Sequence, residues 1–124
     1  LTWVAGFDII YSCQDAAFDA DRGLHSIPAK LGRAGALRLS SALHVLTVLL
    51  LAGVAWRADL SWIFAIALAV AAGLLVWEHS IVSPEDLSRV DLAFFTLNGY
   101  VGVGLFLGTA LDLWLLAPAT TEVL

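Results

Sequence analysis

Three aspartates near the start of the chain have a spacing that suits the binding of a metal ion and a phosphorylated substrate. In a helix that advances ~100° per residue, Asp8, Asp15 and Asp19 fall on one narrow stripe, together with Tyr11 and Arg22. Aligned carboxylates repel one another, and each costs ~2.5–3.5 kcal/mol at the centre of a bilayer, so the stripe needs a neutralising partner. Mg²⁺ suits this role, because it commonly links one or two carboxylates to substrate phosphates.

The alternative interpretation of these aspartates is a solvated helix end whose charges face water. For Asp19 and Asp21 this alternative is as good as a metal site. It is poor for Asp8, because apolar residues lie on both sides of it in WVAGF and IIY. A like-charged set in apolar surroundings favours a functional site.

Basic and polar residues follow the stripe and could complement the oxygens of a diphosphate. Arg22 offers a bidentate fork and Lys30 a point charge, with His25 and Ser26 between them. The alternative is a basic loop beside anionic lipid headgroups, which is the better interpretation for Arg33.

The apolar segments contain a few further polar residues. Asn98 either hydrogen-bonds to a neighbouring helix or faces a substrate, and the first is the better interpretation. His25, His44 and His79 are too scattered to form a metal site, and His44 is expected to hydrogen-bond between helices. Glu78 and His79 end their segment on the side of the long loops, where we expect them to line the mouth of the site.

The composition is that of a membrane protein. The chain is 60% hydrophobic and 14% charged, whereas soluble domains average about 25% charged residues. A net charge of −5 with few basic residues does not favour a nucleic-acid partner. Segments at about 36–57, 60–78 and 91–116 each approach the ~20 apolar residues that cross a bilayer, which predicts an all-α transmembrane helix bundle.

The basic residues predict the orientation of this bundle. The long loops, at about 15–35 and 78–91, lie on one face because three spans alternate sides. Of the six Lys and Arg residues, only Arg57 lies on the opposite face. The positive-inside rule places the long loops in the cytoplasm, so we expect a multi-pass protein of the cell inner membrane with a cytoplasmic site.

The run GFDIIYSCQDAAFDADRGLHSIPAKLG resembles the second aspartate-rich motif of the UbiA superfamily of intramembrane prenyltransferases. The family pattern D-x-x-Y-x-x-x-D-x-x-x-D and the residues after it are met by Asp8, Tyr11, Asp15, Asp19, Gly23, Ser26 and Lys30. The later run VWEHSIVSPEDLSRVDLAFFTLNGYVGVGLF is also similar to this superfamily, in its bacterial 4-hydroxybenzoate and menaquinone-pathway branch.

The resemblance implies a fold of nine transmembrane helices around a central cavity. Residues 1–124 would form the C-terminal part of this single domain, from the end of the sixth helix to the ninth. The chain contains no Met and lacks the family's first motif, N-D-x-x-D-x-x-x-D, so we expect a fragment that is inactive alone.

The resemblance also implies Mg²⁺-dependent transfer of a polyprenyl group from polyprenyl diphosphate to an aromatic acceptor such as 4-hydroxybenzoate, in quinone biosynthesis. Asp15 and Asp19 would hold the metal ion with support from Asp8. The substrate-binding residues would be Tyr11, Arg22, His25, Ser26, Lys30 and Asn98. Because His25 replaces a Lys common in ubiquinone-pathway relatives, haem, chlorophyll or lipid precursors stay open as acceptors. From another class, a membrane transporter subunit is the alternative.

Overall fold

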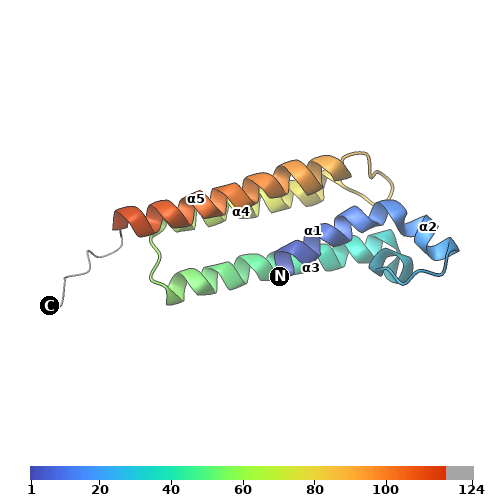
Figure 1. The fold of residues 1–124 in the computed structure, drawn as a ribbon, viewed down its shortest axis with the longest axis horizontal. Helices are drawn as coiled ribbons and strands as arrows, with labels where there is room; N and C mark the ends of the chain where they lie inside the picture. The colour runs from blue at the N-terminus through green and yellow to red at the C-terminus, as the bar shows by residue number, and fades with distance from the viewer. Residues whose placement is uncertain (117–124) are drawn as a thin grey trace.

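The computed structural model describes residues 1–116, and nearly all of them are helical (Figure 1). No strand occurs in this part of the chain, which confirms the all-α prediction. The elements in order are α1 (Thr2–Ser12), a 3-10 turn η1 (Cys13–Asp15), α2 (Ala16–Asp21), α3 (Ile27–Arg57), α4 (Trp62–Ile81), a π-helical segment η2 (Leu92–Leu97) and α5 (Asn98–Leu116).

Three helices are long and apolar enough to cross a membrane: α3, α4, and η2 continued by α5. The helical bundle therefore contains three helices that could cross a membrane, as the sequence led us to expect. Helix α1 packs mainly on α3, and α4 packs mainly on α5. The long loop between α4 and η2 lies at the same end as α2, whereas the α3–α4 turn lies at the other end (Figure 1).

Helix α3 begins at Ile27, nine residues before the apolar segment that predicted it. The hydroxyl of Ser26 accepts a hydrogen bond from the Ala29 N–H at 3.3 Å, which caps the first turn. Gly32 then interrupts the helix with φ 68° and ψ 165°, a conformation that is essentially restricted to glycine. Residues 27–31 thus form a short helical piece that can turn away from the span.

Close contact between α1 and α3 depends on Gly6. The Ser40 hydroxyl donates a 2.7 Å hydrogen bond to the Gly6 carbonyl oxygen. A Cβ atom at Gly6 would overlap the ring of His44 on α3. Nearby, Ile10 is fully buried with Ala36 in an apolar core. These contacts hold α1, which carries part of the predicted site, against the neighbouring span.

At the opposite end of the bundle, Asp112 joins α5 to the start of α4. Its carboxylate accepts hydrogen bonds from the Ser61 N–H and hydroxyl and from the Phe64 N–H, at 2.6–3.1 Å. These groups include free N–H donors of the first turn of α4, so Asp112 acts as a cap supplied by another helix. The α3–α4 turn is thereby fixed to the end of α5.

Candidate active site

The spacing of the aspartates predicted one continuous helix, but the structure divides the stripe among α1, the 3-10 turn and α2. Helix α1 ends at Ser12, and Asp15 has φ −93° and ψ 6° at the end of the 3-10 turn. A 3-10 turn has ~3.0 residues per turn instead of 3.6, so the assumed ~100° per residue fails there. Asp8 and Asp15 are exposed, and Asp19 on α2 is half-buried.

The end of α2 fixes the backbone around Asp19 and Arg22. The Asp19 carbonyl accepts a hydrogen bond from the Leu24 N–H at 2.8 Å, and Gly23 N–H donates to Ala20 at 3.2 Å. This pair of bonds is the Schellman arrangement that ends many helices. The Arg22 guanidinium lies 5.0 Å from the centre of the Phe18 ring.

The stripe carboxylates have no basic partner within residues 1–116. The approach of a carboxylate to a basic side chain described there is that of Glu78 to His44, at 3.9 Å, and it lies far from the stripe in the sequence. This part of the chain also contains no group of three or more His, Cys, Asp or Glu side chains that could hold a metal ion. A metal bound by Asp15 and Asp19 would therefore need further ligands, and the metal assignment stays a prediction.

A cavity of about 330 Å³ brings two of the predicted residues together. It lies between α1 and the start of α3, and Asp8, Ser12 and Ser26 line it with three apolar residues. By contrast, Arg22, His25 and Lys30 are exposed, at the α2 end of the molecule. Their roles in substrate binding stay predictions.

Arg33 has a contact that its sequence context did not indicate. Its Nε donates a 3.2 Å hydrogen bond to the carbonyl oxygen of Cys13, at the start of the 3-10 turn. The residue that was interpreted as a lipid-facing charge therefore links the start of α3 to the break after α1. Nothing in the local sequence signals this pairing, because the two residues belong to different elements.

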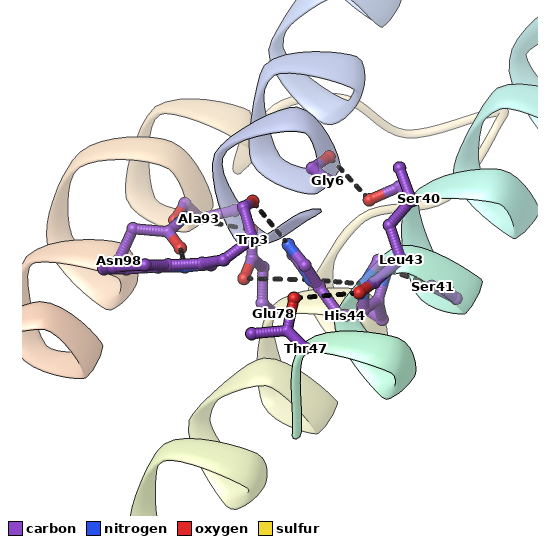
Figure 2. Close-up of polar contacts among 11 residues, drawn as sticks. Trp3, Gly6, Ser40, Ser41, Leu43, His44, Thr47, Glu78, Ala93 and Asn98 are labelled. Carbon is purple, nitrogen blue, oxygen red and sulfur yellow. Dashed lines mark hydrogen bonds and ion pairs between the residues drawn. The ribbon is translucent and has the colours of Figure 1, made fainter. Parts of the chain in front are cut away.

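Asn98 lies inside a polar network that links three helices (Figure 2). Its Oδ1 accepts a bond from Trp3 Nε1 at 2.6 Å. Its Nδ2 donates to Glu78 Oε1 at 3.1 Å and to the Ala93 carbonyl at 2.9 Å. The interhelical alternative is thus observed. Asn98 is only 6% exposed, and both hydrogens of its amide are used. Substrate binding by Asn98 stays a prediction.

A chain of hydrogen bonds also passes through His44, labelled in Figure 2, and through His79. Because the Trp3 carbonyl can only accept, His44 Nε2 donates to it, at 3.2 Å. A neutral His44 then accepts at Nδ1 from His79 Nε2, at 3.0 Å, and His79 Nδ1 accepts from the Ser41 hydroxyl, at 3.1 Å. The interhelical prediction for His44 is confirmed.

The place of Glu78 near the end of its segment suggested that it lines the mouth of the site, but the structure shows that it does not. It has no exposed surface, because α4 turns this side chain toward Asn98 and His44 instead of toward the loops. Its Oε2 lies 3.9 Å from His44 Nδ1 and has no hydrogen-bond partner. The sequence did contain a signal, since Ala71 and Leu75 precede Glu78 on the same helix face and are also buried.

Aromatic rings join α1 to the π-helical segment η2. The centre of the Tyr11 ring lies 4.5 Å from that of Phe94 and 6.2 Å from that of Phe95. Phe7 on α1 also contacts Phe94, at 5.2 Å. The predicted site residue Tyr11 therefore lies at the edge of an aromatic cluster that its sequence context did not indicate.

Comparison with known proteins identifies the family. The sequence profile of the UbiA prenyltransferase family matches residues 1–100. The chain is 32% identical to 4-hydroxybenzoate octaprenyltransferases of Sodalis glossinidius, Klebsiella pneumoniae and Chromohalobacter salexigens, and the alignments cover 90–92% of this chain. It spans 38% of the length of these relatives, and no solved structure matches. On this family match and these relatives, the chain belongs to the UbiA prenyltransferase family.

Proposed function

We propose that the full-length protein transfers a polyprenyl group from polyprenyl diphosphate to an aromatic acceptor such as 4-hydroxybenzoate. The observation that carries this proposal is the run of Asp8, Asp15 and Asp19, which has no basic partner within residues 1–116 and lies within the residues matched by the family profile. The names of the relatives, 4-hydroxybenzoate octaprenyltransferases, support the polyprenyl donor and the aromatic acceptor. We place the reaction in quinone biosynthesis as part of the same proposal.

The donor atoms of the stripe fit a magnesium ion. Asp15 and Asp19 offer carboxylate oxygens free of basic partners within residues 1–116. Mg²⁺ typically binds one or two carboxylates and takes its other ligands from water and substrate phosphates. We therefore assign Asp15 and Asp19 as its ligands, with Asp8 as support. When bound, the ion supplies positive charge that favours departure of the diphosphate.

The remaining residues have roles in binding and exclusion of water. The exposed Arg22, His25 and Lys30 would bind diphosphate oxygens, and Ser26 would do so beside Asp8 in the shared cavity. The apolar faces of the spans would hold the polyprenyl tail. In the reaction, the allylic carbon–oxygen bond breaks, a carbon–carbon bond forms to the acceptor ring, and the ring loses a proton.

The proposal includes the location of the site. The chain has three helices able to cross a membrane, and its basic residues lie mostly beside the long loops. We place these loops, and hence the diphosphate site, on the cytoplasmic side of the inner membrane. There the water-soluble part of each substrate has direct access to the stripe.

Turnover by carboxylate variants tests the proposal. In membranes that contain the full-length protein, Asp15→Asn and Asp19→Asn should each lower transfer to 4-hydroxybenzoate about 10²-fold or more, because charge stabilisation at the leaving group is lost. Asp59→Asn is the matched control, since Asp59 lies in the α3–α4 turn at the other end of the bundle. Wild-type turnover in either site variant would refute the metal-binding role.

The alternative functions have tests of their own. Turnover with a panel of haem, chlorophyll and lipid precursors would identify a different acceptor. Cation transport without diphosphate release would indicate a membrane transporter subunit.

A further inference from the structure

An exposed aromatic surface lies beside the carboxylates, and its phenylalanines have no role in the function proposed so far. Phe95 is 63% exposed and Tyr11 is 39% exposed, although both rings belong to a contacting cluster. Phe94 lies behind them, with its ring centre 4.7 Å from that of Phe95. Tyr11 is three residues after Asp8 on α1, so the two side chains are neighbours on one open helix face.

The π-helical segment η2 carries Phe94 and Phe95 and fixes their positions. Its wider turns leave carbonyl groups that an α-helix would use, and Asn98 Nδ2 donates to one of them, that of Ala93, at 2.9 Å. Asn98 is itself held by Glu78 and Trp3, which belong to α4 and α1. The buried network of Figure 2 therefore fixes the segment that presents Phe94 and Phe95 to α1.

The chemistry that suits this surface follows from the proposed function, on which this inference rests. When the allylic carbon–oxygen bond breaks, the electron pair leaves with the diphosphate and a positive charge spreads over the allylic carbons. An aromatic ring face attracts such a charge, whereas a carboxylate or amine in its place would form a bond to the cation. The ring also excludes water, which would convert the cation to an alcohol.

We propose that Phe95, with Tyr11 beside it and Phe94 behind it, forms an aromatic wall that stabilises and shields the allylic cation. The wall stands on the same open face as Asp8, so a donor whose diphosphate lies at the carboxylates has its first carbons within reach of the rings. The cation is then consumed by the acceptor ring, whose π electrons form the new carbon–carbon bond before its proton leaves.

Variants of Phe95 in the full-length protein test this inference, with polyprenyl diphosphate and 4-hydroxybenzoate as substrates. We expect Phe95→Leu to lower kcat about 10-fold and to change KM for the donor less than ~2-fold. The share of polyprenol among the products should rise, because water reaches the cation. Phe95→Tyr should stay within ~2-fold of wild type, because the ring face is kept. Phe106→Leu is the control, since this exposed ring of α5 has no aromatic neighbour within residues 1–116.

Several results would overturn the wall. These are wild-type kcat and product ratio in Phe95→Leu, equal losses in the Leu and Tyr variants, or a rise in KM alone. Rates are expressed per folded protein, and Phe95→Met replaces the Leu variant if the latter is poorly folded. If Asp15→Asn abolishes transfer while Phe95→Leu does not alter it, only the wall fails. If Asp15→Asn and Asp19→Asn both keep wild-type turnover, the proposed function itself fails.

Discussion

Two acidic side chains are buried among the spans, and their hydrogen bonding differs. Asp112 is 4% exposed and its oxygens accept from Ser61 and Phe64. Glu78 has no exposed surface, and only its Oε1 has a partner, the amide of Asn98. A buried polar atom without a hydrogen-bond partner lowers the stability of the fold. The hydrogen-bonded Asp112 therefore contributes to stability, whereas the Oε2 atom of Glu78 does not.

Substitution of Glu78 should therefore have opposite effects according to what replaces it. Glu78→Gln keeps an oxygen for Asn98 and puts an uncharged amide nitrogen in place of the unpartnered carboxyl oxygen, so no carboxylate charge is buried and we expect an unchanged or higher midpoint of thermal unfolding. Glu78→Ala leaves the Asn98 amide unpaired and should cost about 1–3 kcal/mol. The measurement is thermal unfolding of the purified protein in detergent, with the exposed Glu85→Gln as control. A large loss in the Gln variant would show that the charge itself is needed.

At the scale of the elements, the kink at Gly32 decides where the start of α3 lies. The piece before the kink carries Ser26 at its cap and Lys30 at its end, and Ser26 faces the cavity that Asp8 also lines. The rest of α3 is a regular helix that spans the bundle. The kink thus separates a segment with a predicted role in substrate binding from one with a role in packing.

Two glycines of α3 offer a matched pair of substitutions. Gly32→Ala forces an L-residue into φ 68°, ψ 165°, and we expect it to destabilise the protein by about 1–3 kcal/mol and to lower transfer activity. Gly53→Ala lies in the regular part, where an added Cβ meets no atom within 4 Å, and should be neutral or stabilising by up to ~1 kcal/mol. Thermal unfolding and turnover are measured on both variants. Equal behaviour of the two would mean that the kink is not required.

The elements also show what could be predicted from the sequence. Long apolar runs predicted the three spans, because span length follows from bilayer thickness. The 3-10 turn at Cys13–Asp15 and the π-helical segment could not be predicted, since the same residues are compatible with an α-helix. The carboxylate motif was found by its spacing. Phe95 was not, because its relation to Tyr11 depends on contact between distant elements.

At the scale of the whole molecule, the two ends of the bundle differ in charge. Arg22 follows α2, Arg89 lies in the loop between α4 and η2, and Lys30, Arg33 and Arg38 lie in the first part of α3 near those loops. Only Arg57 lies at the end with the α3–α4 turn. The predicted site residues, from Asp8 to Lys30, lie toward the loop end (Figure 1). The orientation of the bundle therefore determines which compartment supplies the diphosphate and the acceptor.

Single cysteines can test this orientation. We expect Ala58→Cys, in the α3–α4 turn, to react with a membrane-impermeant maleimide in intact spheroplasts, because the positive-inside rule places that turn outside. Glu85→Cys, in the loop between α4 and η2, should react only after permeabilisation. The native Cys13 is fully buried, so the unsubstituted protein serves as the unlabelled control. Labelling of Glu85→Cys in intact spheroplasts would show that the bundle has the opposite orientation. The carboxylates would then face the periplasm, where cytoplasmic diphosphate substrates do not reach them.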